Sequence, residues 1–212
     1  MRNSEIPFVS FDLIRNIRVM ETLAKLFGSE TKVKMMRLFL FNPEKVFVSQ
    51  EVSERVNADI SKVRREVSGL EKMGLVKHRT NGRTNGKKGY ILNSQFSYLS
   101  SLQNFLINVD PLQPKEIVKR LGKLGSIKLI IVSGVFIQEP ESRADLLVVG
   151  DNIKRKALEH TIKILESEIG KELRYAYFTT QDFNYRMSMF DKLVRDILDY
   201  PHRKIVYKLG LV

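Results

Sequence analysis

The sequence DISKVRREVSGLEKMGLVKHR, residues 59–79, decides how the N-terminal half of this chain folds. Its apolar residues recur at helical spacing and define one face: Ile60, Val63, Val67, Leu70 and Met73. The other face is polar and basic, with Arg64 at the border: Ser61, Lys62 and Arg65. The segment therefore predicts a helix that buries one side, presents cations on the other, and ends at Gly74.

Beyond this helix, residues 75–79 and 89–92 have the composition of two extended strands. The intervening sequence TNGRTNGKK contains two Asn-Gly pairs, which favour positive φ angles and tight reversal of the chain. Six basic residues lie between Lys72 and Lys88, and no carboxylate follows until Asp110. A basic β-hairpin is therefore predicted, with a local positive potential.

Upstream, the spacing predicts three further helices. Residues 13–27 carry apolar side chains at steps of three and four, namely Leu13, Ile17, Met20, Leu23 and Phe27. This helix should end near Gly28, and its apolar stripe either joins the core or mediates dimerisation. Ser29 can cap a second helix, which should stop at Asn42-Pro43 because proline cannot donate the next helical hydrogen bond. A short helix is expected over residues 49–56.

Three helices followed by a basic hairpin are the order of a winged helix. The string SGLEKMGLVKHR resembles the end of the recognition helix and the first wing strand of winged helix-turn-helix regulators of the ArsR type, from about Ser29 to Leu92. The resemblance implies duplex DNA as ligand. It implies contacts in or beside the major groove from Ser61, Lys62, Arg64 and Arg65, and contacts to phosphate or the minor groove from Arg79, Arg83, Lys87 and Lys88. The other interpretation is a protein docking module with a charged, soluble loop.

Residues 94–109 predict one more amphipathic helix, with these residues on one face: Phe96, Leu99, Leu102, Phe105 or Leu106, and Val109. Such a helix either pairs with its twin in a homodimer or packs onto its own domain. Residues 110–114, DPLQP, have the composition of a linker. We therefore divide the chain into an N-terminal helix (1–28), a winged helix (29–93), a linker or dimerisation helix (94–114) and a C-terminal domain (115–212).

The C-terminal half alternates helical and extended patterns, which predicts a layered α/β domain with a mixed sheet and an α+β fold class for the whole chain. Helices are expected over residues 115–124, 159–170 and 181–198, with Met187 and Met189 in the core. Strands are expected over residues 127–134, 144–149, 173–179 and 204–208.

The stretch SGVFIQEPESRADLLVVGD, residues 133–151, is similar to the minimal nucleotidyltransferase domain of the polymerase beta superfamily, and the resemblance covers roughly Val118 to Lys208. The family implies two magnesium ions held by aspartates two residues apart and by a third acid on a later strand. It also implies a Gly-Ser turn whose N–H groups bind phosphates.

This sequence departs from that pattern at its chemical points. Gly134 fits the turn and Asp145 the second aspartate, but Val135 stands in place of the serine and Arg143 in place of the first aspartate. A cation in place of a ligand repels the metals, so we predict neither a catalytic site nor a metal or cofactor. Gly134, Arg143 and Asp145 either bind phosphate or a nucleotide effector or are only strand ends, with Asp145 paired to Arg143 or another base. The alternative is a catalytic site in which Asp145 and another acid between Glu139 and Asp151 hold magnesium.

Composition limits the remaining classes of protein. The chain has 36 Lys and Arg against 24 Asp and Glu, a formal charge of +12 that suits a polyanionic partner. It has no cysteine, which excludes thiolate metal sensing, and no apolar run long enough for a membrane helix. We therefore expect a cytoplasmic, dimeric, DNA-binding regulator, with an active magnesium-dependent nucleotidyltransferase as the alternative.

Overall fold

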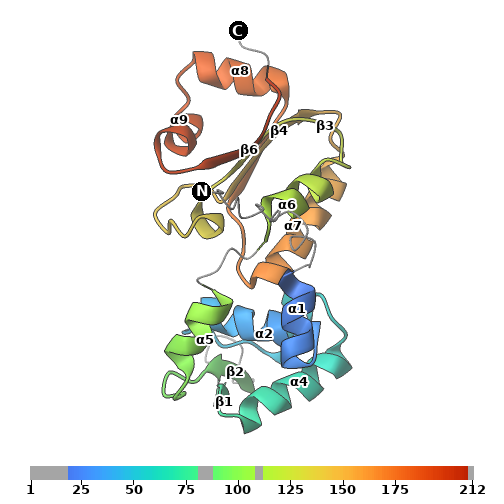
Figure 1. Cartoon of the computed structure of the whole chain (residues 1–212), viewed down its shortest axis with the longest axis vertical. Helices are drawn as coiled ribbons and strands as arrows, with labels where there is room; N and C mark the ends of the chain where they lie inside the picture. Colours follow the sequence, from blue (N-terminus) through green and yellow to red (C-terminus); the bar gives the residue numbers. More distant parts are fainter. Residues whose placement is uncertain (1–18, 81–87, 108–111, 210–212) are drawn as a thin grey trace, which may run out of the picture.

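The computed structural model describes residues 19–80, 88–107 and 112–209 in two halves, one above the other in Figure 1. The lower, N-terminal half is mainly helical, and the upper half is built on a mixed sheet. The α+β class predicted from the sequence is confirmed.

The helices of the N-terminal half begin and end largely where local signals place them: α1 (Val19–Phe27), α2 (Glu30–Phe41), α3 (Ser49–Val56) and α4 (Ile60–Lys72). Ser29 caps α2, its hydroxyl accepting a hydrogen bond from the Lys32 N–H at 3.0 Å. Gly28 and Gly74 adopt positive φ angles of 89° and 80° after α1 and α4. Leu13 and Ile17 lie outside the described residues.

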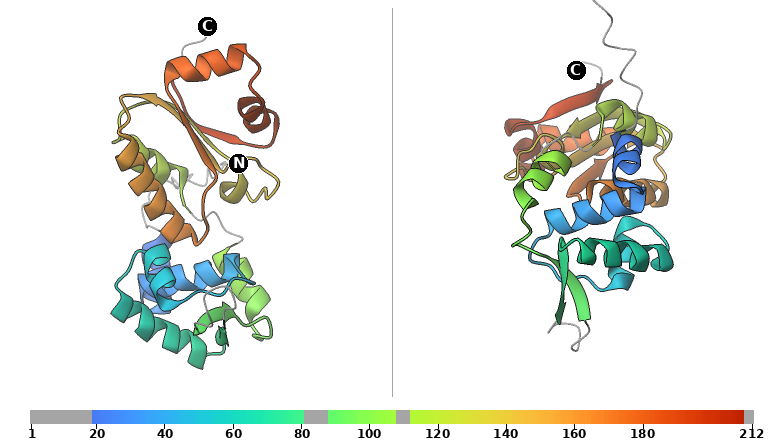
Figure 2. Two further views of the ribbon diagram at one scale, coloured as in Figure 1. Left: turned by 180° about the vertical axis from the view of Figure 1, so that it is seen from behind. Right: turned by 60° about the horizontal axis from the view of Figure 1, so that its bottom comes forward.

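The predicted hairpin is formed by β1 (Val76–Thr80) and β2 (Lys88–Leu92), which pair antiparallel. The connection between α2 and α3 joins it through Phe47 and Tyr90, whose N–H groups donate to each other's carbonyl oxygens at 2.9 and 2.8 Å. Figure 2 shows the hairpin projecting from the N-terminal half.

Helix α5 (Leu99–Leu106) packs mainly onto its own half. Leu106 is fully buried in the same core as Leu23 of α1 and Phe39 of α2, and Phe96, Leu99 and Leu102 pack against that core. Phe105 remains 47% exposed, so the helix also retains an outward apolar side chain.

The described strands of the C-terminal half form one sheet in the order β5-β4-β3-β6, in which β4 and β5 are parallel and the other pairs antiparallel. Their bounds are Ser126–Val132 (β3), Leu146–Asp151 (β4), Tyr175–Phe178 (β5) and Arg203–Tyr207 (β6). The predicted mixed sheet is confirmed.

Helices cover both faces of this sheet (Figure 1): α6 (Pro114–Leu121) and α7 (Arg155–Ile169) on one side, α8 (Thr180–Ser188) and α9 (Lys192–Asp199) on the other. Ile130 of β3 and Val148 of β4 face α6 and α7, whereas Ile131 and Leu147 face α8 and α9. Burial on both faces explains why β3 and β4 are apolar runs without alternation.

The region after β5 differs from the sequence prediction. A single helix was expected over residues 181–198, but α8 ends at Ser188 and Asp191 caps a new helix, accepting a hydrogen bond from the Val194 N–H at 3.1 Å. Phe190 has a φ angle of 55° in the break. Met187 and Met189 are 43% and 62% exposed, so their prediction as core residues was wrong. Met189 follows the end of α8 and lies in the break, where the helical periodicity no longer applies, whereas Met187 lies in the last turn of α8, a helix that buries Phe183.

The two halves meet where the C-terminal end of α7 contacts α2 and α3. Arg37 of α2 is fully buried there, and its Nη1 donates to the Glu168 carbonyl at 2.9 Å while its Nε donates to the Leu106 carbonyl at 3.2 Å. Burial lowers the pKa of the Arg37 guanidinium to about 10, against the opposing effect of the Glu168 carboxylate. The charge is kept in the interior because the surrounding carbonyl dipoles partly replace water.

Gly170 allows the end of α7 to lie close to the backbone of α2. It ends α7 with a φ angle of 90°, and a Cβ added to it would lie 2.5 Å from the Arg37 carbonyl carbon and 2.7 Å from the Leu38 nitrogen. Its own carbonyl accepts a hydrogen bond from Asn42 Nδ2 at 3.1 Å. Only glycine satisfies both the backbone conformation and the contact.

Among the described helices, none has the length and apolar character needed to cross a bilayer.

Candidate nucleic-acid interface

Helix α4 is positioned by its apolar face. Val63, Val67 and Leu70 are buried in the core of the N-terminal half, as their spacing predicts, but Met73 is 54% exposed because α4 ends before it. The opposite face is open to solvent: Ser61, Arg64 and Arg65 are exposed, and Lys62 is partly exposed.

The basic side chains of this outward face are not neutralised within the part of the chain that the structure describes. Lys62, Arg64 and Arg65 form no ion pair with its carboxylates. The two acids of α4 interact elsewhere: Glu66 accepts from the Ser29 hydroxyl at 2.8 Å and pairs with Lys32, whereas Glu71 contacts His78 at 3.2 Å. The cationic charge of α4 is therefore available to an external anion.

The hairpin adds a second cationic surface. Arg79 of β1 lies opposite Gly89, and Lys88 of β2 lies opposite Thr80; both basic side chains are exposed. Arg83 and Lys87, also predicted to bind DNA, lie outside the described residues. The major groove of B-DNA, about 12 Å wide, admits an α-helix, so the diameter of α4 does not prevent it from entering the groove.

The structure brings Gly134 and Asp145 of the predicted phosphate site together. Gly134 opens a 3-10 turn (Gly134–Phe136) with a φ angle of 55°, and a Cβ on it would lie 2.0 Å from Asp145 Oδ1. The Asp145 carboxylate is fully buried, and Oδ1 accepts a hydrogen bond from the Val135 N–H at 3.0 Å.

Arg174, not Arg143, completes this arrangement. Its N–H and Nε donate to Asp145 Oδ2 at 2.9 and 3.2 Å. Arg143 is 65% exposed and instead pairs with Asp196 at 3.5 Å. Asp145 thus ties the turn after β3 to the start of β5, which is a structural role for a carboxylate that accepts several donors.

Sequence reasoning considered a basic partner for Asp145 but did not identify Arg174. The two residues are separated by 29 positions and meet only because β4 and β5 are parallel neighbours. A basic residue near the start of the strand predicted over residues 173–179 was the one available signal. Within the described ranges, no three His, Asp or Glu side chains are grouped to hold a metal ion.

Comparison with known proteins does not assign a family. No protein-family model matches the sequence, and no curated protein is significantly similar to it. A solved structure described as "Possible transcriptional regulator from Methanosarcina mazei Go1" is similar at 18% sequence identity and a TM-score of 0.32. The similarity covers 50% of this chain and 83% of that one. At such a TM-score it carries no argument about fold or function.

Proposed function

We propose that this protein is a transcriptional regulator that binds duplex DNA through α4 and the β1–β2 hairpin. The observation that carries the proposal is the outward face of α4, where Arg64 and Arg65 are exposed and unpaired with any carboxylate of the described residues. The buried apolar face of α4 holds the helix in place, so the cations on its opposite face are positioned to contact base edges and phosphates.

The arrangement around α4 supports a winged helix. Helices α2, α3 and α4 precede a hairpin that the α2–α3 connection joins through Phe47, and the hairpin bears exposed Arg79 and Lys88. In this proposal α4 is the recognition helix and the hairpin is the wing. Ser61, Lys62, Arg64 and Arg65 then contact or flank the major groove, while Arg79, Arg83, Lys87 and Lys88 contact the backbone or minor groove.

For the C-terminal half we propose a nucleotidyltransferase-like layout that has lost its reaction and serves oligomerisation, effector binding or partner docking. Asp145, the one aspartate that fits the motif, is buried and accepts hydrogen bonds from Val135 and Arg174. A carboxylate committed to these donors is poorly placed to hold magnesium.

The salt dependence of DNA affinity tests the proposal. Fluorescence anisotropy should show Kd rising with salt, with a slope of about 0.9 logarithmic units per phosphate contacted for each tenfold increase. The duplex is first selected from a randomised pool, and a scrambled duplex is the control. A preference of about 10³ or more supports a specific regulator. Equal affinity for the selected and the scrambled duplex would contradict a sequence-specific regulator.

We also propose that the regulator is a homodimer. A cavity of about 490 Å³ lies on the N-terminal half. Its lining is largely apolar and includes four large side chains that are 47% to 70% exposed, Leu26, Met73, Tyr98 and Phe105. Exposed apolar side chains gathered between α1 and α5 suit a two-fold contact with a second copy of the chain.

Analytical ultracentrifugation checks this contact. The wild-type chain should sediment as a dimer at micromolar concentration, and Leu26→Ser combined with Tyr98→Ser should shift it to monomer, because the apolar area buried between copies is reduced. Tyr185→Ser, which alters an equally exposed aromatic residue on α8, should remain dimeric. A monomeric wild-type protein across this range would rule out the dimer.

A further inference from the structure

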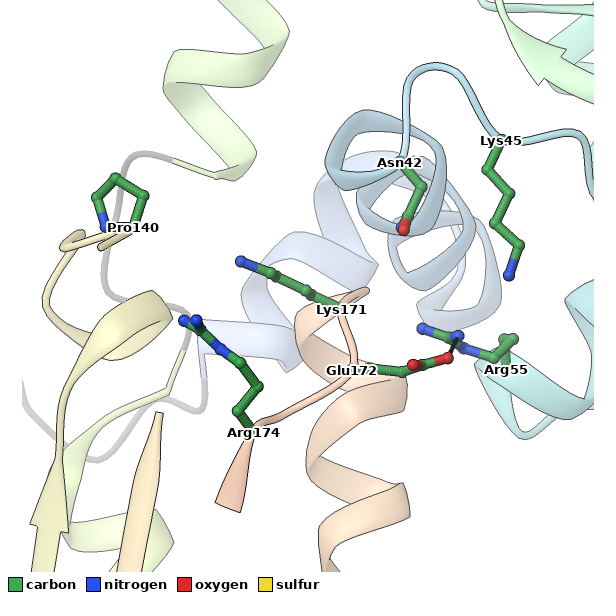
Figure 3. A pocket seen from close by; sticks show the side chains of 7 residues that line it. All are labelled: Asn42, Lys45, Arg55, Pro140, Lys171, Glu172 and Arg174. Atoms are coloured by element: carbon green, nitrogen blue, oxygen red, sulfur yellow. Dashed lines mark hydrogen bonds and ion pairs between the residues drawn. The ribbon is translucent and has the colours of Figure 1, made fainter. Parts of the chain in front are cut away.

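A cavity of about 440 Å³ lies at the junction of the two halves, and both contribute to its walls (Figure 3). Asn42 and Lys45 come from the connection between α2 and α3, and Arg55 comes from α3. The C-terminal half contributes Pro140, which follows the turn after β3, and Lys171, Glu172 and Arg174 from the connection between α7 and β5. Four of these seven side chains are cationic and one is acidic.

Several hydrogen-bond donors of these cations remain free in the part of the chain that the structure describes. Lys171 forms no ion pair or side-chain hydrogen bond there, and Figure 3 shows it extending into the space beside Arg174. Arg174 binds Asp145 through Nε and Nη2, which leaves Nη1 without a partner. The cavity thus combines positive charge with N–H groups that are not committed to other acceptors.

Hydrogen bonds and an ion pair hold several of the lining side chains in position. Asp145 fixes the orientation of Arg174, and Asn42 is bonded through Nδ2 to the carbonyls of Leu38 and Gly170. Glu172 pairs with Arg55 across the junction. A binding site whose donors are positioned in advance loses less side-chain entropy when a ligand arrives.

We infer that this cavity binds a small molecule carrying two or more phosphate groups. Its size lies in the range of small-molecule sites, roughly 300–1,000 Å³. Lys171 and Arg174 lie on the C-terminal side of the cavity. Lys45 and Arg55 lie on the N-terminal side, where they pair with Glu51 and Glu172. A ligand with adjacent phosphates therefore meets cations on both sides of the junction. Guanidinium and ammonium groups both form strong charge-assisted hydrogen bonds to phosphate.

A ligand bound in this cavity would alter the contact between the two halves. A phosphate bound to Arg55 competes with Glu172, which is the ion pair that links α3 to the C-terminal half. Helix α3 packs against α4. An effect of the ligand on DNA binding follows if the proposed function is correct; the binding site does not depend on it.

Isothermal titration calorimetry of the full chain with pyrophosphate, at fixed ionic strength, tests the inference. Wild type should bind pyrophosphate more tightly than inorganic phosphate or sulfate. Lys171→Ala should weaken binding about 10-fold or more, as expected for loss of a charge-assisted hydrogen bond. Lys171→Glu should abolish binding. The control is Lys192→Ala, which removes an exposed lysine on α9 and should bind like wild type.

Two results would overturn the inference. One is pyrophosphate binding that is absent from wild type or unchanged in Lys171→Glu. The other is a loss of DNA affinity in Lys171→Ala, without added anion, as large as the loss caused by replacing Arg64 and Arg65 of α4 by alanine, since the cavity would then be part of the DNA surface. The calorimetry contains no DNA, so failure of the regulator proposal leaves its outcome unaffected.

Discussion

Replacing Arg64 and Arg65 together by alanine is expected to lower the affinity for the selected duplex by roughly 30- to 1,000-fold, or about 2–4 kcal/mol. Both side chains lie on the exposed face of α4, and neither pairs with a carboxylate of the described residues. Their removal takes away contacts to base edges and phosphates without creating a cavity in the core. Anisotropy titrations of wild type and variant at the same salt concentration measure the change.

The matched control removes two cations from a different surface. Lys192→Ala combined with Arg195→Ala changes the net charge by the same amount on exposed positions of α9. It should weaken binding much less, since it changes only the long-range potential, which salt screens. If both double variants lose affinity equally, the interaction depends on total charge and α4 is not the reading surface.

A second large effect is expected from Gly170→Ala, which should reduce the free energy of unfolding by about 2–4 kcal/mol. The left-handed conformation accounts for about 1 kcal/mol of this loss. The remainder comes from the new methyl group, which would lie 2.5–2.8 Å from backbone and side-chain atoms of Arg37 and Leu38 in α2. Equilibrium urea unfolding measures the change, with denaturation followed by circular dichroism.

Gly74→Ala separates the two contributions. Gly74 also has a positive φ angle, 80°, but a Cβ on it would meet no atom within 4 Å. Its substitution should cost only the conformational strain, about 1 kcal/mol. Similar losses in the two variants would show that the halves move apart to accept the methyl group and that their contact contributes little to stability.

The elements of the N-terminal half were predicted well because their signals are local. Ser29 caps α2, Asn42-Pro43 ends it and Gly74 follows α4, each through the conformational preference of a single residue. The exposed face of α4 also follows from its period. The prediction of one helix over residues 181–198 was wrong at Phe190. The left-handed backbone conformation of this residue interrupts the helix, although the apolar periodicity continues in the sequence.

The site residues also divide into those that local sequence signals predicted and those that depend on tertiary contacts. The exposure of Arg64, Arg65, Arg79 and Lys88 agrees with their prediction as surface cations, and their binding to DNA stays a prediction. The partner of Asp145 depends on strand order, which the sequence does not specify. The cavity beside Lys171 combines two halves whose contact had no sequence signal at all.

The sequence by itself determined the order of helices and strands as far as β5, the mixed α+β class and the cationic face of α4, because periodicity, charge and turn residues act over a few positions. The tertiary structure alone decided that Asp145 binds Arg174, 29 residues away, and that Arg37 is buried against Glu168, 131 residues away. Such pairs depend on how sheet order and interhelical packing bring distant segments together. A side chain's local pattern carries no information about those distances.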